Sequence, residues 1–151
     1  MKAVSMSVPN SVLIADDDED IRALISVMLT RAGYTTETVD GGIPVLDVVD
    51  TPGRSTPLPG MFVLDVRMPD VDGLHLCRRL KADPLTAGTP VLLISAESSP
   101  ADLAAGYAAG CDDYLPKPFT ARELVRRVEL LLASVRGDRP APVAVAARRP
   151  A

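Results

Sequence analysis

Three carboxylates, one hydroxyl and one amine follow separate apolar runs along this chain. They are Asp16 and Asp17 after residues 12–15, Asp65 after 61–64, Ser95 after 91–94, and Lys117 shortly after 112–115. Three carboxylates brought together repel one another and favour a cation between them. Oxygen ligands suit a hard ion, and Mg²⁺ in particular binds through one or two carboxylates together with phosphate. These residue types therefore predict a Mg²⁺ site, provided that the fold brings them together.

The same side chains carry the charges that a phosphoryl group requires. Mg²⁺ and the ammonium of Lys117 would balance the three carboxylates and leave the site near neutral. A carboxylate can act as a nucleophile and form an aspartyl-phosphate. Phosphoryl transfer depends mainly on positioning and charge neutralisation, which the metal, Lys117 and the Ser95 hydroxyl would supply.

The apolar runs have the length and composition of buried strands. The runs "VLIA", "MFVL" and "VLLI" do not alternate with polar residues, which is typical of parallel strands covered by helices on both faces. The Thr-rich segment 34–39 and the short segment 112–115 predict strands at the two edges of the sheet.

Helical patterns alternate with these strands. They cover residues 19–32, 43–50 and 73–82, a segment that starts at Pro100 with Ser99 as its N-cap, and residues 120–135 with Thr120 as the cap. The second helix is the weakest, because it has two glycines and a proline and runs into a Pro/Gly loop over 51–60.

Alternation of strands and helices predicts right-handed βαβ units. The predicted fold class is α/β, a doubly wound (βα)5 flavodoxin-like fold with a parallel five-stranded sheet in the order 2-1-3-4-5. Ligands of such sheets bind beyond the carboxyl ends of the strands, where the carboxylates, the hydroxyl and the amine are placed.

Five consecutive acids, residues 16–20, divide into two groups. Asp16 and Asp17 are predicted to face the metal. Asp18 is placed to cap the first helix, and Glu19 and Asp20 fall in its first turn, where the helix dipole favours negative charge.

Composition limits the function classes that fit the chain. Its 151 residues, 47% of them hydrophobic, predict one globular domain over residues 11–136, between a flexible tail (1–10) and a disordered Ala/Pro/Arg tail (137–151). A net charge of −4 argues against direct binding of nucleic acid. The absence of a secretory signal, the short apolar stretches and the two cysteines, interpreted as free thiols, predict a cytoplasmic protein without membrane insertion.

The ordered motifs resemble those of a known family. "LIADDDEDIRAL", "FVLDVRMPDVDG", "VLLISAES" and "GCDDYLPKPF" are similar to the receiver domain of two-component response regulators, over about residues 11–136. The resemblance implies a phosphoprotein of signal transduction, a stand-alone receiver similar to the chemotaxis receiver. Its donor would be a sensor histidine kinase or a histidine phosphotransfer protein, and its output would be phosphorelay or the binding of a downstream protein.

The resemblance also implies a role for each residue of the site. Asp65 would be the phosphoacceptor, and the only catalysis would be its own phosphorylation and dephosphorylation. The metal ligands would be Asp17, Asp65 and the backbone carbonyl of Arg67, with Asp16 acting through a water. Lys117 would pair with the phosphoryl oxygens, and the Lys117–Pro118 bond would be cis. Ser95 would bind the phosphate, and Tyr114 would swing inward and remodel the face formed by the fourth helix, fifth strand and fifth helix, although simple packing explains Tyr114 equally well.

Two residues of the site depart from the family pattern. Arg67 lies two positions after Asp65, and Glu97 lies two positions after Ser95. Both positions flank the entrance for an attacking water, so we predict that Arg67 and Glu97 form a partial lid that slows loss of the phosphoryl group.

Other function classes fit less well. A phosphorylation-independent scaffold of receiver type would lack a site residue, and none is missing. A Mg²⁺-dependent phosphohydrolase with an aspartyl nucleophile would need an acid two positions after the nucleophile, where Arg67 stands. A natural single-domain protein and a piece of a longer regulator both remain open.

Overall fold

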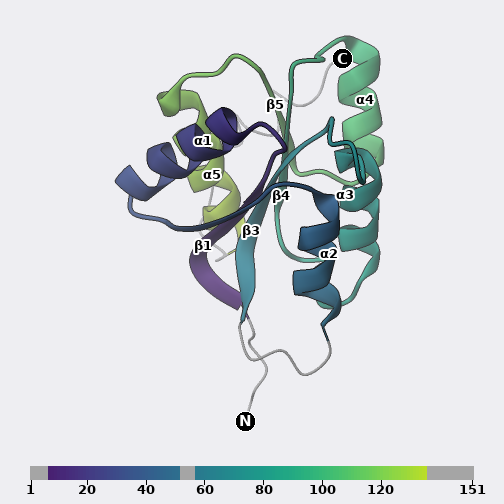
Figure 1. The fold of residues 1–151 in the computed structure, drawn as a ribbon, viewed down its shortest axis with the longest axis horizontal. Coiled ribbons are helices and arrows are strands. Elements are labelled where there is room, and N and C mark those ends of the chain that lie inside the picture. The colour runs from purple at the N-terminus through teal and green to yellow at the C-terminus, as the bar shows by residue number, and fades with distance from the viewer. Residues whose placement is uncertain (1–6, 52–56, 136–151) are drawn as a thin grey trace.

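The computed structural model describes residues 7–51 and 57–135 and contains five parallel strands and five helices (Figure 1). The strands are β1 (Ser7–Ala15), β2 (Thr35–Val39), β3 (Leu58–Asp65), β4 (Val91–Ser95) and β5 (Asp113–Pro116). The helices are α1 (Glu19–Arg31), α2 (Gly42–Asp50), α3 (Gly73–Ala82), α4 (Pro100–Ala108) and α5 (Ala121–Val135). The sheet order is β2-β1-β3-β4-β5, which confirms the predicted doubly wound fold.

The sheet separates two helical layers, with α1 and α5 on one face and α2, α3 and α4 on the other (Figure 1). Successive strand residues point to opposite faces, so Leu13 packs into the layer with α2 and α3, whereas Val12 and Ile14 pack against α1 and α5. Burial of β1, β3 and β4 on both sides explains their continuous apolar sequences.

The three helix caps predicted from the sequence, those of α1, α4 and α5, are present in the structure. Asp18 accepts hydrogen bonds from the backbone N–H groups of Asp20 and Ile21 at the start of α1. Ser99 and Asp102 cap each other's backbone at the start of α4. Thr120 accepts from the Glu123 N–H, and Glu123 accepts from the Thr120 N–H, so the predicted cap of α5 is confirmed.

The predicted boundary of the N-terminal tail is wrong, because β1 already begins at Ser7. Ser7 pairs with Leu58, so β3 also begins inside the segment predicted as a loop. Pro59 belongs to the Pro/Gly segment predicted as a loop, and Pro9 lies in the predicted tail; proline is uncommon inside strands because it lacks an N–H. Pro59 lies where β3 pairs only with β1, since pairing with β4 begins at residue 62. Pro9 falls in the irregular stretch of the β1–β3 register between Val8 and Val12, before pairing with β2 begins at residue 11. The missing donor therefore costs little there.

Other predictions concern the thiols, the tails and membrane insertion. Cys77 and Cys111 are buried and form no disulfide, and burial raises the pKa of the Cys77 thiol to about 11, as expected of a core residue. Residues 1–6 of the predicted N-terminal tail (1–10), and the whole predicted tail 137–151, lie outside the described residues. Within the described ranges, no helix has the length and apolar character needed to cross a bilayer.

Candidate functional site

The predicted site residues meet at the carboxyl edge of the sheet. Asp65 ends β3 and pairs in register with Ile94, and Ser95 ends β4 and pairs with Pro116, one residue before Lys117. Asp16 follows β1 directly. Four strands therefore end at one level, and this parallel register is what brings side chains far apart in sequence to one edge.

Lys117 joins two of the carboxylates. Its Nζ atom lies 3.3 Å from Asp16 Oδ2 and 3.3 Å from Asp65 Oδ1. The Lys117 backbone N–H donates to the Ser95 carbonyl at 2.8 Å, and the peptide bond to Pro118 is cis, as predicted. The backbone hydrogen bond to Ser95 holds Lys117 beside the end of β4.

The three carboxylates form a cluster that fits a divalent cation. Oxygen atoms of Asp16, Asp17 and Asp65 all lie within 4.8 Å of one another. Asp16 and Asp65 are buried, with 1% and 6% of their surfaces exposed, whereas Asp17 faces solvent. An all-oxygen donor set with one open side suits Mg²⁺, which keeps several waters when it binds to protein.

The buried carboxylates and the lysine change one another's affinity for protons. Burial and the neighbouring charge of Asp16 raise the pKa of Asp65 from 3.8 to about 6, although Lys117 opposes the change. Burial by itself would lower the pKa of Lys117, but the charges of Asp65 and Asp16 raise it above its usual value. Lys117 therefore stays cationic at neutral pH, while Asp65 holds its charge at a cost in stability.

The raised pKa of Asp65 predicts that the metal-free protein loses stability as pH rises. The folded state holds the proton more tightly than the unfolded state, so the stabilising effect is complete below about pH 4 and disappears as pH rises through about 6. A pKa rise from 3.8 to about 6 corresponds to ~3 kcal/mol in the free energy of unfolding. Urea unfolding in EDTA at pH 4 to 7.5 measures this change.

Asp65→Asn isolates the effect of this one carboxyl from other titrating groups. At pH 7.5 the variant should be more stable than the wild type, and near pH 4 the difference should vanish. Added Mg²⁺ should remove most of the difference at pH 7.5, because the cation stabilises the charged carboxylate. A stability difference that is the same at both pH values would contradict this account.

Ser95 and Tyr114 are connected through the backbone of Glu97. Ser95 is fully buried, and its Oγ accepts a hydrogen bond from the Glu97 N–H at 3.0 Å. The Tyr114 hydroxyl donates to the Glu97 carbonyl at 2.6 Å. The tyrosine ring is buried and faces inward against Gly106, where a Cβ atom would lie 2.6 Å from ring carbon Cδ2. The inward ring therefore needs a glycine at position 106.

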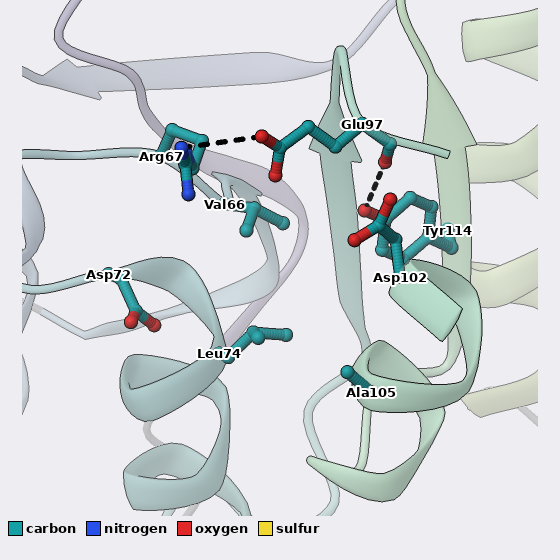
Figure 2. A pocket seen from close by; sticks show the side chains of 8 residues that line it. All are labelled: Val66, Arg67, Asp72, Leu74, Glu97, Asp102, Ala105 and Tyr114. Carbon is teal, nitrogen blue, oxygen red and sulfur yellow. Dashed lines mark hydrogen bonds and ion pairs between the residues drawn. The ribbon is translucent and has the colours of Figure 1, made fainter. Parts of the chain in front are cut away.

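The side chain of Glu97, whose backbone connects Ser95 and Tyr114, forms an ion pair with Arg67. Arg67 Nη2 lies 3.3 Å from Glu97 Oε2, and both side chains are exposed, by 70% and 45%. The pair lines a small pocket of about 190 Å³. Figure 2 shows Arg67, Val66 and Leu74 on one side of this pocket and Glu97 and Tyr114 on the other. The two residues predicted to form a lid are thus in contact with each other.

Two residues with clear roles in the geometry of the site were not predicted. Asp70, in the loop after β3, accepts three backbone hydrogen bonds, two from the start of α2 and one from Val71 in its own loop. Gly73 packs so closely on the end of β3 that a Cβ atom would lie 2.5 Å from the Asp65 carbonyl oxygen. The run "MPDVDG" contains both and indicates a turn, but no local signal says which atoms the turn must approach.

Comparison with known proteins gives the family. A model described as the response regulator receiver domain matches residues 12–129. The transcriptional regulatory protein GltR of Pseudomonas aeruginosa is 38% identical over 122 residues, which are 81% of this chain and 48% of that protein. The response regulator MprA of Mycobacterium sp. strain KMS is 38% identical over 132 residues, which are 86% of this chain and 54% of that protein. The chain thus spans about half the length of these curated relatives.

Solved structures agree with the sequence relatives. The receiver domain of Francisella response regulator 1452 is 33% identical, with a TM-score of 0.72 over 83% of this chain and 98% of that one. The chemotaxis response regulator CheY4 of Vibrio cholerae is 28% identical, with a TM-score of 0.71 over 80% of this chain and 97% of that one. With the fold, the family model and the relatives in agreement, this chain belongs to the receiver domains of two-component response regulators.

Proposed function

We propose that this receiver domain accepts a phosphoryl group on Asp65 from a phosphohistidine of a sensor histidine kinase or histidine phosphotransfer protein. The observation that carries the proposal is the contact of Lys117 with Asp16 and Asp65 inside a cluster of three carboxylates. An Asp65 carboxylate oxygen would attack phosphorus, so that a P–O bond forms while the P–N bond breaks. The electron pair of the broken bond goes to the imidazole of the donor.

Each residue of the site has a defined part in this transfer. Asp17, Asp65 and the carbonyl of Arg67 would hold Mg²⁺, with Asp16 bound through a water. The cation would offset charge on the phosphoryl oxygens. Lys117 would leave Asp16 and pair with a phosphoryl oxygen, because its ammonium already lies 3.3 Å from the nucleophile. The Ser95 hydroxyl would donate a hydrogen bond to the same group.

Output is proposed to pass through α4, β5 and α5. The Ser95 hydroxyl and the Tyr114 hydroxyl both contact the backbone of Glu97, so a movement of Ser95 toward a phosphoryl group changes the support of the tyrosine. The face presented to a downstream protein would change with it. The two cysteines form no disulfide, which supports a cytoplasmic location for this exchange.

Acetyl phosphate tests the proposal without a cognate kinase. With Mg²⁺, intact mass spectrometry should detect the gain of one phosphoryl group, and with EDTA the adduct should fall to background. A wild-type chain that gains nothing at saturating acetyl phosphate and Mg²⁺ would contradict the proposal and favour a phosphorylation-independent scaffold.

The Arg67–Glu97 pair should slow hydrolysis of the aspartyl-phosphate by covering the path of the attacking water. If breaking the pair lowers the barrier by roughly 0.5–1 kcal/mol, Arg67→Ala and Glu97→Ala should each lose the phosphoryl group about two- to fivefold faster. The double variant should be no faster than either single variant, because one contact is removed in all three. Decay of the mass adduct after removal of the donor measures the rates.

Arg79→Ala provides the matched control. Arg79 Nη2 lies 2.9 Å from Asp50 Oδ2 in an exposed ion pair between α3 and α2, away from the strand ends that carry the site. Its loss should leave the hydrolysis rate unchanged. Wild-type rates in both Arg67→Ala and Glu97→Ala would end the lid hypothesis.

A further inference from the structure

Helix α2 is capped by a side chain from another part of the chain. Its N-cap residue is Gly41, which has no side chain to accept a hydrogen bond. The two carboxylate oxygens of Asp70 take that role. Oδ1 accepts from the Gly42 N–H at 3.0 Å, and Oδ2 accepts from the Ile43 N–H at 2.8 Å. The loop between β3 and α3 thus supplies the cap for a helix that begins 28 residues earlier.

The two glycines at the start of α2 make room for this contact. A Cβ atom at Gly41 would lie 2.5 Å from Asp70 Oδ2, and one at Gly42 would lie 2.8 Å from the Val71 Cβ. The φ angle of Gly41 is −176°, which any residue can adopt, so close approach and not backbone conformation requires the glycine. The glycines that weaken α2 as a helix are therefore the ones that let Asp70 reach it.

The capping carboxylate is itself fixed within the loop that follows the phosphoacceptor. Asp70 Oδ1 also accepts from its neighbour's N–H, that of Val71, at 2.7 Å. The loop begins with the Val66 N–H donating to the Ile94 carbonyl at 3.0 Å and closes with the Gly73 N–H donating to the Val66 carbonyl at 2.8 Å. Between these backbone bonds lies Arg67, whose carbonyl is the proposed third protein ligand of Mg²⁺.

We propose that Asp70 is a positioning residue for the metal-binding loop, and that its cap on α2 couples Mg²⁺ binding to the stability of that helix. The proposal rests on the proposed function only in taking the Arg67 carbonyl as a ligand. Helix α2 is short and carries Pro44, so much of its N-terminal stability depends on this cap. A cation that holds the loop in place would stabilise the capped form of α2. By thermodynamic linkage, the capped form would then bind the cation more tightly than the uncapped form.

Asp70→Ala in the full chain tests the coupling with Mg²⁺ alone. Calorimetric titration should give an affinity about tenfold weaker than that of the wild type, the size of effect seen when residues that support metal ligands are lost. Hydrogen exchange gives a second readout. In the wild type, Mg²⁺ should slow exchange of the α2 amides, and in Asp70→Ala this protection should disappear.

Gly41→Ala disturbs the same contact, between the Asp70 carboxylate and the start of α2, from the helix side. It gives an independent test in case Asp70→Ala fails to fold. The added methyl group would displace the Asp70 carboxylate and should weaken Mg²⁺ binding in the same direction. Thr86→Val is the control for general stability. It removes the hydrogen bond from Thr86 Oγ1 to the Leu80 carbonyl, at the far end of α3, and should leave Mg²⁺ affinity unchanged.

Wild-type Mg²⁺ affinity in both Asp70→Ala and Gly41→Ala would overturn the proposal, and so would α2 amides that do not respond to Mg²⁺ in the wild type. Neither measurement uses a phosphoryl donor. A chain that binds Mg²⁺ in the Asp70-dependent way but takes no phosphoryl group from acetyl phosphate would therefore refute the proposed function and leave this inference standing.

Discussion

Asp65→Asn should form no phosphoryl adduct with acetyl phosphate and Mg²⁺ under conditions that saturate the wild type. An amide cannot replace the carboxylate as a nucleophile, so the P–O bond has no acceptor oxygen. Asp16 should not take over, because its Oδ1 accepts the Asp18 N–H at 2.9 Å and its Oδ2 faces Lys117 at 3.3 Å. Intact mass spectrometry over time measures the adduct.

Loss of the adduct in this variant would not be explained by unfolding. The raised pKa of Asp65 means that its charge is unfavourable in the metal-free fold, so the asparagine variant should be at least as stable as the wild type at pH 7.5. Asp20→Asn, on the exposed first turn of α1, serves as the control for neutralising an acid and should be phosphorylated normally. Unchanged adduct yield in Asp65→Asn would assign the phosphoacceptor to another residue.

Asp17→Asn should weaken Mg²⁺ binding by at least about tenfold, because it removes a negative charge and a carboxylate oxygen from the open side of the carboxylate cluster. Asp17 is the exposed member of the cluster, so its replacement leaves the packing of the strand ends intact. Calorimetric titration with Mg²⁺ measures the affinity, and the rate of phosphorylation by acetyl phosphate should fall in parallel.

The acidic run around Asp17 contains the matched control for this prediction. Asp18 and Asp20 carry the same charge in the same segment, but Asp18 caps α1 and Asp20 lies in its first turn. Asp20→Asn should leave Mg²⁺ affinity unchanged, and Asp18→Asn should affect mainly stability, by about 1 kcal/mol or less. Equal losses of Mg²⁺ affinity in Asp17→Asn and Asp20→Asn would mean that the acidic run attracts the cation only through its total negative charge. That result would contradict the division into a metal-binding pair, Asp16 and Asp17, and a helix cap, Asp18.

Most of the fold could be predicted from the sequence because its signals are local. Strands β1, β3 and β4 are buried on both faces and so appear as continuous apolar runs, and the caps Asp18, Ser99 and Thr120 act within three residues. The parallel arrangement then placed the predicted site residues at one edge, since the carboxyl ends of such strands gather there.

Strand boundaries could not be predicted where pairing overrides local preference. Proline is uncommon inside strands, yet Pro59 lies where β3 pairs only with β1, and Pro9 lies in an irregular stretch of the β1–β3 register. Whether a missing N–H matters depends on which strand lies beside it, and no local pattern contains that information.

The sequence by itself determined which chemical groups end each strand and therefore which kind of site the chain could build. Only the tertiary structure decided how those groups affect one another. The raised pKa of Asp65 depends on burial and on Asp16, which follows a different strand, and the cap from Asp70 to α2 depends on the distance between a loop and a helix 28 residues apart. Electrostatic and hydrogen-bond energies vary steeply with separation, and separation between distant segments is set only when the helices pack on the sheet.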